Sequence, residues 1–271
     1  MIYIQDNETL KMFVPNVLKE AAGERTYFEK ILPSLLQSEE WWITHVIGRS
    51  YAEKVLGDED LAKFVRMGVA VYAQYLAVPQ LDLILTPNGF GIISNQNLVP
   101  ASKERVAALR EQLFSIRNAM VNVVLTYLLK IAEWRIQKEA GMYISTTINA
   151  PRHYKLDCSW EEYADFVDKA YAIEYNLEES VLTKAVHVTL VSTLESELTS
   201  TQLWLKEAVR RYVLAKVNQD MGVNLMNEAQ NMVQRIRTNP DDFPGWADSD
   251  VAKLWSGSGF ENEKESTGYF F

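Results

Sequence analysis

The chain has 271 residues, of which 48% are hydrophobic and 23% are charged, and its formal net charge at pH 7 is −9. Enough apolar side chains are present to offset the entropy lost on folding, which excludes a wholly disordered protein. The acidic balance argues against a protein that grips nucleic-acid phosphates, because such proteins usually carry a basic face. Arg210, Arg211 and Lys216 form either a local basic patch or a solvated helix face, and the solvated face is the favoured interpretation.

The single cysteine, Cys158, excludes an internal disulfide framework and indicates synthesis in a reducing cytoplasm. We expect Cys158 to be a small, partly buried residue beside a helix start rather than a nucleophile. The first residues lack a basic region followed by an apolar run, so no signal peptide is expected. The most apolar stretch, 119–129, contains Asn122 and Thr126 and is too short and too polar to span a bilayer.

The first eighty residues read as helices. Apolar residues recur at helical spacing over 27–36, where Pro33 must kink the run or begin a new helix. A second run covers 61–76, with Asp58 as its predicted N-cap and Pro79 closing it.

The period then changes to that of short strands. Residues 81–85 and 90–93 are β-prone and are joined by Thr86, Pro87, Asn88 and Gly89. Proline presets φ for a turn, and Asn-Gly tolerates positive φ, so the sequence predicts a β-hairpin over 81–93. Phe90 follows the sharp reversal and has little local core to enter.

The clearest predicted element is a helix over 102–140, a stretch without Gly or Pro that ends at Gly141, a C-cap candidate. A helix of this length would be roughly 60 Å long, which predicts the central helix of a bundle. Its apolar residues step by three and four in a heptad pattern, with a phase slip at Ile131 and Trp134; they are Val106, Leu109, Leu113, Ile116, Met120, Val123 and Tyr127.

Further helices are predicted downstream. Residues 142–148 allow a strand, and Ser159 with Glu162 forms a capping box that opens the next helix. Helix and strand both remain open for 181–194, which are rich in Val and Thr. Helices are expected over 201–217 and 223–236.

After Pro240 no period survives, and the composition turns to glycine, acidic and small polar residues with interspersed aromatics. We divide the chain into a helical domain, 1–240, and an extended C-terminal arm, 241–271. Such an arm either folds back on its own domain or binds a partner. The candidate partner-binding residues are those of the hairpin tip and the aromatic residues of the arm: Pro87, Asn88, Gly89, Phe90, Trp255, Phe260, Tyr269, Phe270 and Phe271.

No catalytic, cofactor-binding or metal-binding motif is recognisable, so no such residue is assigned and an enzyme is not expected. Phosphate-binding glycine loops, the G-x-S-x-G elbow and H-E-x-x-H are absent from the sequence. Each of the three histidines is expected to be a surface or hydrogen-bonded residue; they are His45, His153 and His187. The acidic run 58–60 suits a helix start, and Asp248 and Asp250 lack the pattern of a calcium loop.

One segment carries a resemblance. Residues 81–95, LDLILTPNGFGIISN, continue to Pro100, Ala101, Ser102, Lys103, Glu104 and Arg105. This string resembles a family of virion-associated proteins from tailed phages and prophages of Bacteroides-type gut bacteria. In that family a T-P-x-G-F-G-[IV]-[IV]-S-N hairpin leads through P-A-S-K-x-R into a long helix. The close match covers 81–106, about a tenth of the chain.

The resemblance implies a head-to-tail connector, or adaptor, in the virion neck. Such proteins are helical bundles with a protruding hairpin and an extended arm, and they form a ring, expected here to be a dodecamer, beneath the portal. The implied partners are copies of the chain, the portal protein and other neck or tail proteins, with DNA only passing through a channel and no membrane.

The expected fold is mainly α, a helical bundle around one long central helix with a small β-hairpin and an extended C-terminal arm. The alternative functions are a DNA-packaging factor similar to a small terminase subunit and, less favoured, a hydrolase with dispersed catalytic residues.

Overall fold

The computed structural model describes residues 1–14, 25–81, 83–86, 89–92 and 102–256. Over these residues the chain is mainly α-helical, which confirms the predicted class. It divides into two compact units: unit 1 is Met1–Tyr143 with Ala150–Tyr163, and unit 2 is Ile144–Asn149 with Ala164–Phe271.

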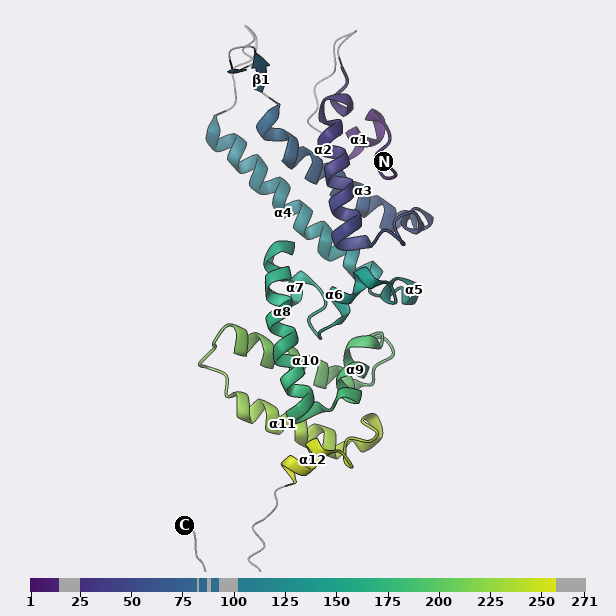
Figure 1. Cartoon of the computed structure of the whole chain (residues 1–271), viewed down its shortest axis with the longest axis vertical. Helices are drawn as coiled ribbons and strands as arrows, with labels where there is room; N and C mark the ends of the chain where they lie inside the picture. Colours follow the sequence, from purple (N-terminus) through teal and green to yellow (C-terminus); the bar gives the residue numbers. More distant parts are fainter. Residues whose placement is uncertain (15–24, 82, 87–88, 93–101, 257–271) are drawn as a thin grey trace, which may run out of the picture. The chain divides into compact units, whose positions relative to one another are not determined.

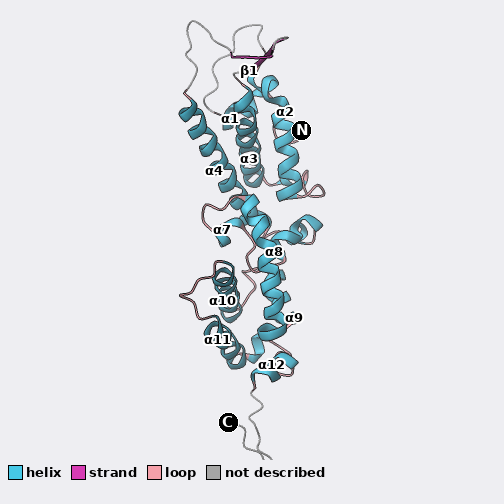
Figure 2. Ribbon diagram, turned by 60° about the vertical axis from the view of Figure 1, so that its left-hand side comes forward, coloured by secondary structure: helices cyan, strands magenta, loops and turns pink. Residues whose placement is uncertain are grey.

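Three long helices form the body of unit 1, and α3 packs against both of the others (Figures 1 and 2). The central helix is therefore α3 and not the helix predicted over 102–140. Small residues explain this, because α3 buries Gly68, Ala70 and Ala73 and lets neighbouring helices approach closely. The helices that begin unit 1 are α1 (Asn7–Phe13), α2 (Tyr27–Trp42), α3 (Glu59–Ala77) and α4 (Lys103–Leu128).

Side-chain caps begin these helices. The Asp58 carboxylate accepts a hydrogen bond from the Leu61 N–H, so the predicted N-cap of α3 is confirmed. Thr26 and Glu29 form a capping box at the start of α2. Pro33 lies inside α2 rather than at the start of a new helix.

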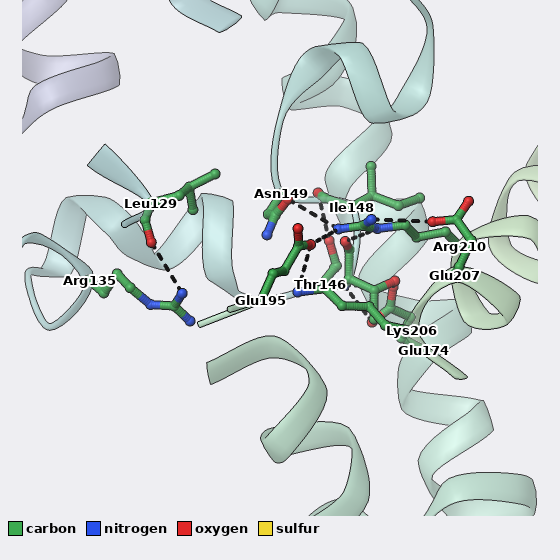
Figure 3. A network of polar contacts seen from close by, with 11 residues as sticks. Leu129, Arg135, Thr146, Ile148, Asn149, Glu174, Glu195, Lys206, Glu207 and Arg210 are labelled. Carbon is green, nitrogen blue, oxygen red and sulfur yellow. Dashed lines mark hydrogen bonds and ion pairs between the residues drawn. The ribbon is translucent and has the colours of Figure 1, made fainter. Parts of the chain in front are cut away.

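The predicted helix over 102–140 is wrong beyond Leu128. The chain turns at Ile131, which has extended backbone angles, and Trp134 is buried with its indole N–H donating to the Ile47 carbonyl at 2.7 Å. The Arg135 guanidinium donates to the Leu129 carbonyl, one of those left free where a helix ends (Figure 3). Gly141 begins a short helix instead of capping a long one.

The buried stripe of α4 also differs from the predicted heptad stripe. It includes Arg117 and is offset by about one residue, while Leu109 of the predicted stripe is 37% exposed. One residue rotates a helical face by roughly 100°, so the two stripes point in different directions. The buried residues of α4 are Leu113, Arg117, Asn118, Val121, Val124, Leu125 and Leu128.

Two short strands precede α4. β1 (Leu83–Thr86) and β2 (Gly89–Ile92) pair antiparallel, with Leu83 opposite Ile92 and Thr86 opposite Gly89. The turn residues Pro87 and Asn88 lie outside the described residues, so the hairpin as a complete unit stays a prediction.

Short helical elements connect the long helices. Residues 142–148, for which a strand was allowed, form the end of α6 and an irregular loop. The short elements between residues 43 and 154 are η1 (Ile43–Ile47), η2 (Lys54–Gly57), η3 (Val78–Gln80), α5 (Ala132–Arg135), η4 (Lys138–Ala140), α6 (Gly141–Ile144) and α7 (Pro151–Tyr154).

Unit 2 contains the remaining helices except for the first turn of α8, which belongs to unit 1. The predicted capping box is confirmed, since Ser159 and Glu162 exchange both hydrogen bonds at the start of α8. The open stretch 181–194 is helical, as the end of η5 and α9. The elements after residue 159 are α8 (Trp160–Leu177), η5 (Glu178–Leu182), α9 (Lys184–Ser192), α10 (Ser200–Val217), α11 (Leu225–Thr238), η6 (Pro240–Asp242) and α12 (Asp250–Trp255).

The first part of the predicted arm is folded, which corrects the expectation that it is extended from 241. Residues 241–256 include α12 and pack against η5. Two indole N–H groups hold them there, as Trp246 donates to the Val181 carbonyl at 2.8 Å and Trp255 donates to the Ser180 carbonyl. Both acceptors lie in η5, a π-helical turn. Residues 257–271 lie outside the described residues.

Close packing of α2 on α3 makes a first prediction. A methyl group added at Gly68 would lie 2.2 Å from the Trp42 ring, whereas one added at Gly57 would meet nothing within 4 Å. Because Trp42 is fully buried and cannot move aside, Gly68→Ala should destabilise the protein by about 1–3 kcal/mol or more. Urea denaturation measures this, with Gly57→Ala as the matched control; equal effects of the two substitutions would contradict the packing argument.

Candidate functional site

Few of the predicted partner-binding residues have described surroundings. Pro87, Asn88, Phe260, Tyr269, Phe270 and Phe271 lie outside the described residues, and Gly89 and Phe90 are described only as part of β2. Trp255 lies at the end of α12, half-buried, with its indole N–H bonded to Ser180. The partner-binding role of these residues therefore stays a prediction.

A buried carboxylate organises unit 2. Glu174 on α8 is fully buried, and both of its oxygens accept hydrogen bonds from the Thr147 N–H at 3.0 Å. The Thr147 hydroxyl donates to the same carboxylate at 2.6 Å. His187 on α9 places its Nε2 2.6 Å from Glu174 and its Nδ1 3.4 Å from Glu178. Glu174 thereby joins the loop 144–149 to two helices of unit 2.

Burial and these carboxylates act oppositely on His187. Burial alone would lower the pKa of His187, but the hydrogen bond to Glu174 and the charges of Glu174 and Glu178 outweigh it. The pKa of His187 is therefore raised above its ordinary value of 6.5.

Basic side chains of α10 hold the same loop from another direction (Figure 3). The Arg210 Nε donates to the Thr147 carbonyl at 2.7 Å, and its Nη2 donates to Glu195 at 2.7 Å. Lys206, almost fully buried, lies 3.2 Å from the same carboxylate. Burial opposes ionisation of Glu195, yet Lys206 and Arg210 lower its pKa to about 2. Arg210 thus belongs to an internal ion pair and not to a solvated basic face.

The Glu174 cluster has the residue types of a hydrolytic triad but not their connections. In such a triad the nucleophilic hydroxyl donates to a histidine, and a carboxylate orients that histidine from its other side. Here the Thr147 hydroxyl donates to Glu174, and His187 contacts the two glutamates instead. Each of these contacts ties one backbone segment of unit 2 to another, so the cluster has a structural role.

Unit 1 is organised by a buried arginine. Arg117 of α4 is fully buried, and its guanidinium makes two hydrogen bonds to Glu161, at 2.9 and 2.7 Å. The same group lies over the rings of Trp41, Tyr72 and Phe114 at 4.7, 4.8 and 4.3 Å from their centroids. Three helices and the first turn of α8 therefore converge on one cation.

The only cysteine lies in the same unit. Cys158 lies beside the start of α8, as expected from the sequence, but it is fully rather than partly buried. Burial raises the pKa of its thiol to about 12, so the nucleophilic thiolate does not form near neutral pH.

The surface of unit 1 has two adjoining hollows, of about 510 and 480 Å³, which share Met12, Phe13 and Lys63. The second is lined by apolar side chains of α3 and α4, including Met67 and Leu109. Met12 at its edge is 79% exposed. An apolar surface of this kind is typical of a binding site for another chain, and it is the candidate functional site.

The first hollow adds positive charge to the candidate site. Lys63 is exposed there and makes no ion pair with a described residue, and the buried Arg66 Nε has no hydrogen-bond partner among the described residues. Asp6 and Glu59 also line this hollow. The Arg66 side chain lines the same hollow, so two basic residues stand beside its apolar side chains.

The described residues offer neither a metal site nor a membrane-spanning helix. They contain no group of three or more His, Cys, Asp or Glu side chains placed to hold a metal ion. In the same part of the chain, no helix is both long and apolar enough to cross a membrane.

Comparison with known proteins gives one match. Residues 15–141 are similar to a family described as "Family of unknown function (DUF6712)". The match falls within unit 1, contains α2, α3, β1, β2 and α4, and covers less than half of the chain. No curated protein and no solved structure matches the chain.

Arg117 should be the most costly cation of unit 1 to remove. Arg117→Ala leaves three rings and Glu161 without their shared partner, and we expect a loss of more than about 2 kcal/mol in unfolding free energy. Arg49→Ala is the control, because Arg49 and Glu40 form an exposed pair that contributes about 0–1 kcal/mol. Denaturant titration of both variants measures the two changes in unfolding free energy. Similar losses of unfolding free energy would contradict a central role for Arg117.

His187 should make stability depend on pH. Its pKa is raised on folding, so its stabilising contribution is complete below pH 6.5 and is lost as the pH rises through the folded-state pKa. The unfolding free energy of the wild type should therefore fall more between about pH 6 and pH 9 than that of His187→Gln.

NMR titration of the His187 imidazole measures the same shift directly. Glu178→Gln removes a charge 3.4 Å from Nδ1 and should move the midpoint to lower pH. A wild-type midpoint at or below 6.5 would overturn the assignment.

Proposed function

We propose that this chain is a structural virion protein of a tailed phage, a head-to-tail connector that forms a homo-oligomeric ring beneath the portal. Its partners in this proposal are further copies of itself, the portal protein and other neck or tail proteins. The hairpin predicted over 81–93 and the residues 257–271 contact neighbouring subunits, and duplex DNA passes through the ring without specific binding.

The candidate site on unit 1 is the observation that carries the proposal. A ring subunit needs a surface that receives its neighbour, and the two hollows offer apolar side chains from α1, α3 and α4 beside two cations. The resemblance of residues 81–106 to virion-associated proteins is the reason for proposing that this assembly is a ring in a phage virion.

The distribution of charge supports passage of DNA rather than its capture. Arg117, Lys206 and Arg210, three of the basic residues, are bound to carboxylates inside their own units. With those cations internally paired and a net charge of −9, the surface has an excess of acidic groups. Acidic walls repel phosphates and let a duplex slide.

Mass photometry and negative-stain electron microscopy of the purified chain test the proposal. We expect closed rings of a single stoichiometry at micromolar concentration, alone or after addition of the portal protein. A chain that stays monomeric under both conditions would refute the connector proposal.

Fluorescence anisotropy with a labelled duplex separates the connector from the packaging factor. A connector should show no appreciable binding at physiological salt. Submicromolar binding with a steep salt dependence would favour the packaging factor instead.

A further inference from the structure

Helix α4 presents two apolar stripes, and among the described residues of unit 1 only one of them packs fully against other helices. The inner stripe contains Val121, Val124 and Leu128, all fully buried against the other helices. The second stripe contains Leu109 and Ile116, which line the second hollow together with Met12 and Met67. A second apolar stripe facing a hollow indicates a surface that a further chain segment covers.

The charges at this surface restrict the segment. Lys63 is common to both hollows, and Arg66 lines the first. A segment that matches the surface must bring apolar or aromatic side chains for the second hollow and carboxylates for the two cations.

The chain itself contains such a segment. Residues 257–271 carry the aromatic residues Phe260, Tyr269, Phe270 and Phe271. Between them stand three glutamates and one lysine over 261–265, which gives this stretch a net negative charge. Glycine and serine at 256–259 join it to α12 without the capacity to build a core.

We infer that the two hollows of unit 1 receive residues 257–271 of a second copy of this chain. Aromatic side chains enter the second hollow beside Leu109 and Met67, and the glutamates approach Lys63 and Arg66. The inference rests on the proposed self-association and names the contact through which one subunit holds the next.

Photocrosslinking in the full-length chain tests this contact. With p-benzoyl-phenylalanine in place of Phe270, irradiation should crosslink residue 270 to the peptides that contain Met12 and Met67, because benzophenone reacts readily with methionine C–H groups. Mixing ¹⁵N-labelled and unlabelled chains before irradiation should give mixed-isotope products, which identify two different copies. Products within one chain, or at peptides away from the hollows, would overturn the inference.

Matched substitutions separate the contact from general effects. Leu109→Glu places a charge in the second hollow and should lower the crosslink yield by about tenfold or more, whereas Leu36→Glu changes a 51% exposed leucine of α2 outside both hollows and should leave the yield unchanged. Lys63→Glu and Lys30→Glu are the corresponding test and control for the contribution of charge. Both lysines are exposed, and only Lys63 lines the hollows.

The outcomes for the contact and for the proposed function differ. Rings that form normally while residue 270 crosslinks elsewhere overturn the contact alone. A chain that stays monomeric and gives no mixed-isotope product overturns both.

Discussion

Burial of the Arg117 guanidinium constrains the whole of unit 1. A charged group removed from water must recover its solvation from partners fixed in the right geometry. Glu161 provides two charge-assisted hydrogen bonds, and rings from α2, α3 and α4 cover the faces of the guanidinium. The rotation of α4 about its axis is fixed by this requirement. Successive residues of a helix are rotated by roughly 100°, so turning Arg117 inward turns Leu109 and Ile116 together toward the second hollow.

Unit 2 uses a carboxylate in the corresponding way. Glu174 is fully buried and holds the backbone of Thr147, while Arg210 holds the carbonyl of the same residue. A loop that crosses a helical unit has no ladder of its own for its backbone groups. In the loop 144–149, the side chains of Glu174 and Arg210 provide hydrogen bonds that a helix or sheet would otherwise supply. Buried charge therefore positions loops and helix faces here.

Whether a feature of the fold could be predicted from the sequence depends on how far apart in the chain the interacting residues lie. The cap at Asp58 and the box at Ser159 depend on residues three positions apart, and both were predictable. The end of α4 depends on Trp134 reaching Ile47, which lies 87 positions earlier, and no local period reports such a contact. Residues 241–256 look unstructured by composition because their order comes from the carbonyls of η5, which accept from Trp246 and Trp255.

Arg117 is also the reason that the candidate site could not be predicted from the sequence. A search for apolar periodicity counts Arg117 as an outward residue and assigns Leu109 and Ile116 to the core. One signal was present, since Leu113, Val121, Val124 and Leu128 follow helical spacing if position 117 is allowed to be charged. The glutamate that makes this possible, Glu161, is 44 residues away, so the alternative phase could not be recognised from the helix alone.

The energetics of the candidate site bear on the form of the proposed assembly. Full burial of one apolar side chain contributes roughly 1.5–3 kcal/mol, whereas association of two chains costs about 4–15 kcal/mol in lost motion and ordering. A few side chains in two hollows, opposed further by the ordering of a glycine-tethered segment, give a weak contact between two isolated subunits. A head-to-tail contact leaves the site of one subunit and the segment of another unused until the ring closes. Closure adds a further contact within the same assembly, where the effective concentration is high. Weak individual contacts of this kind favour closed rings over dimers, and they leave each subunit free to exchange until the ring is complete.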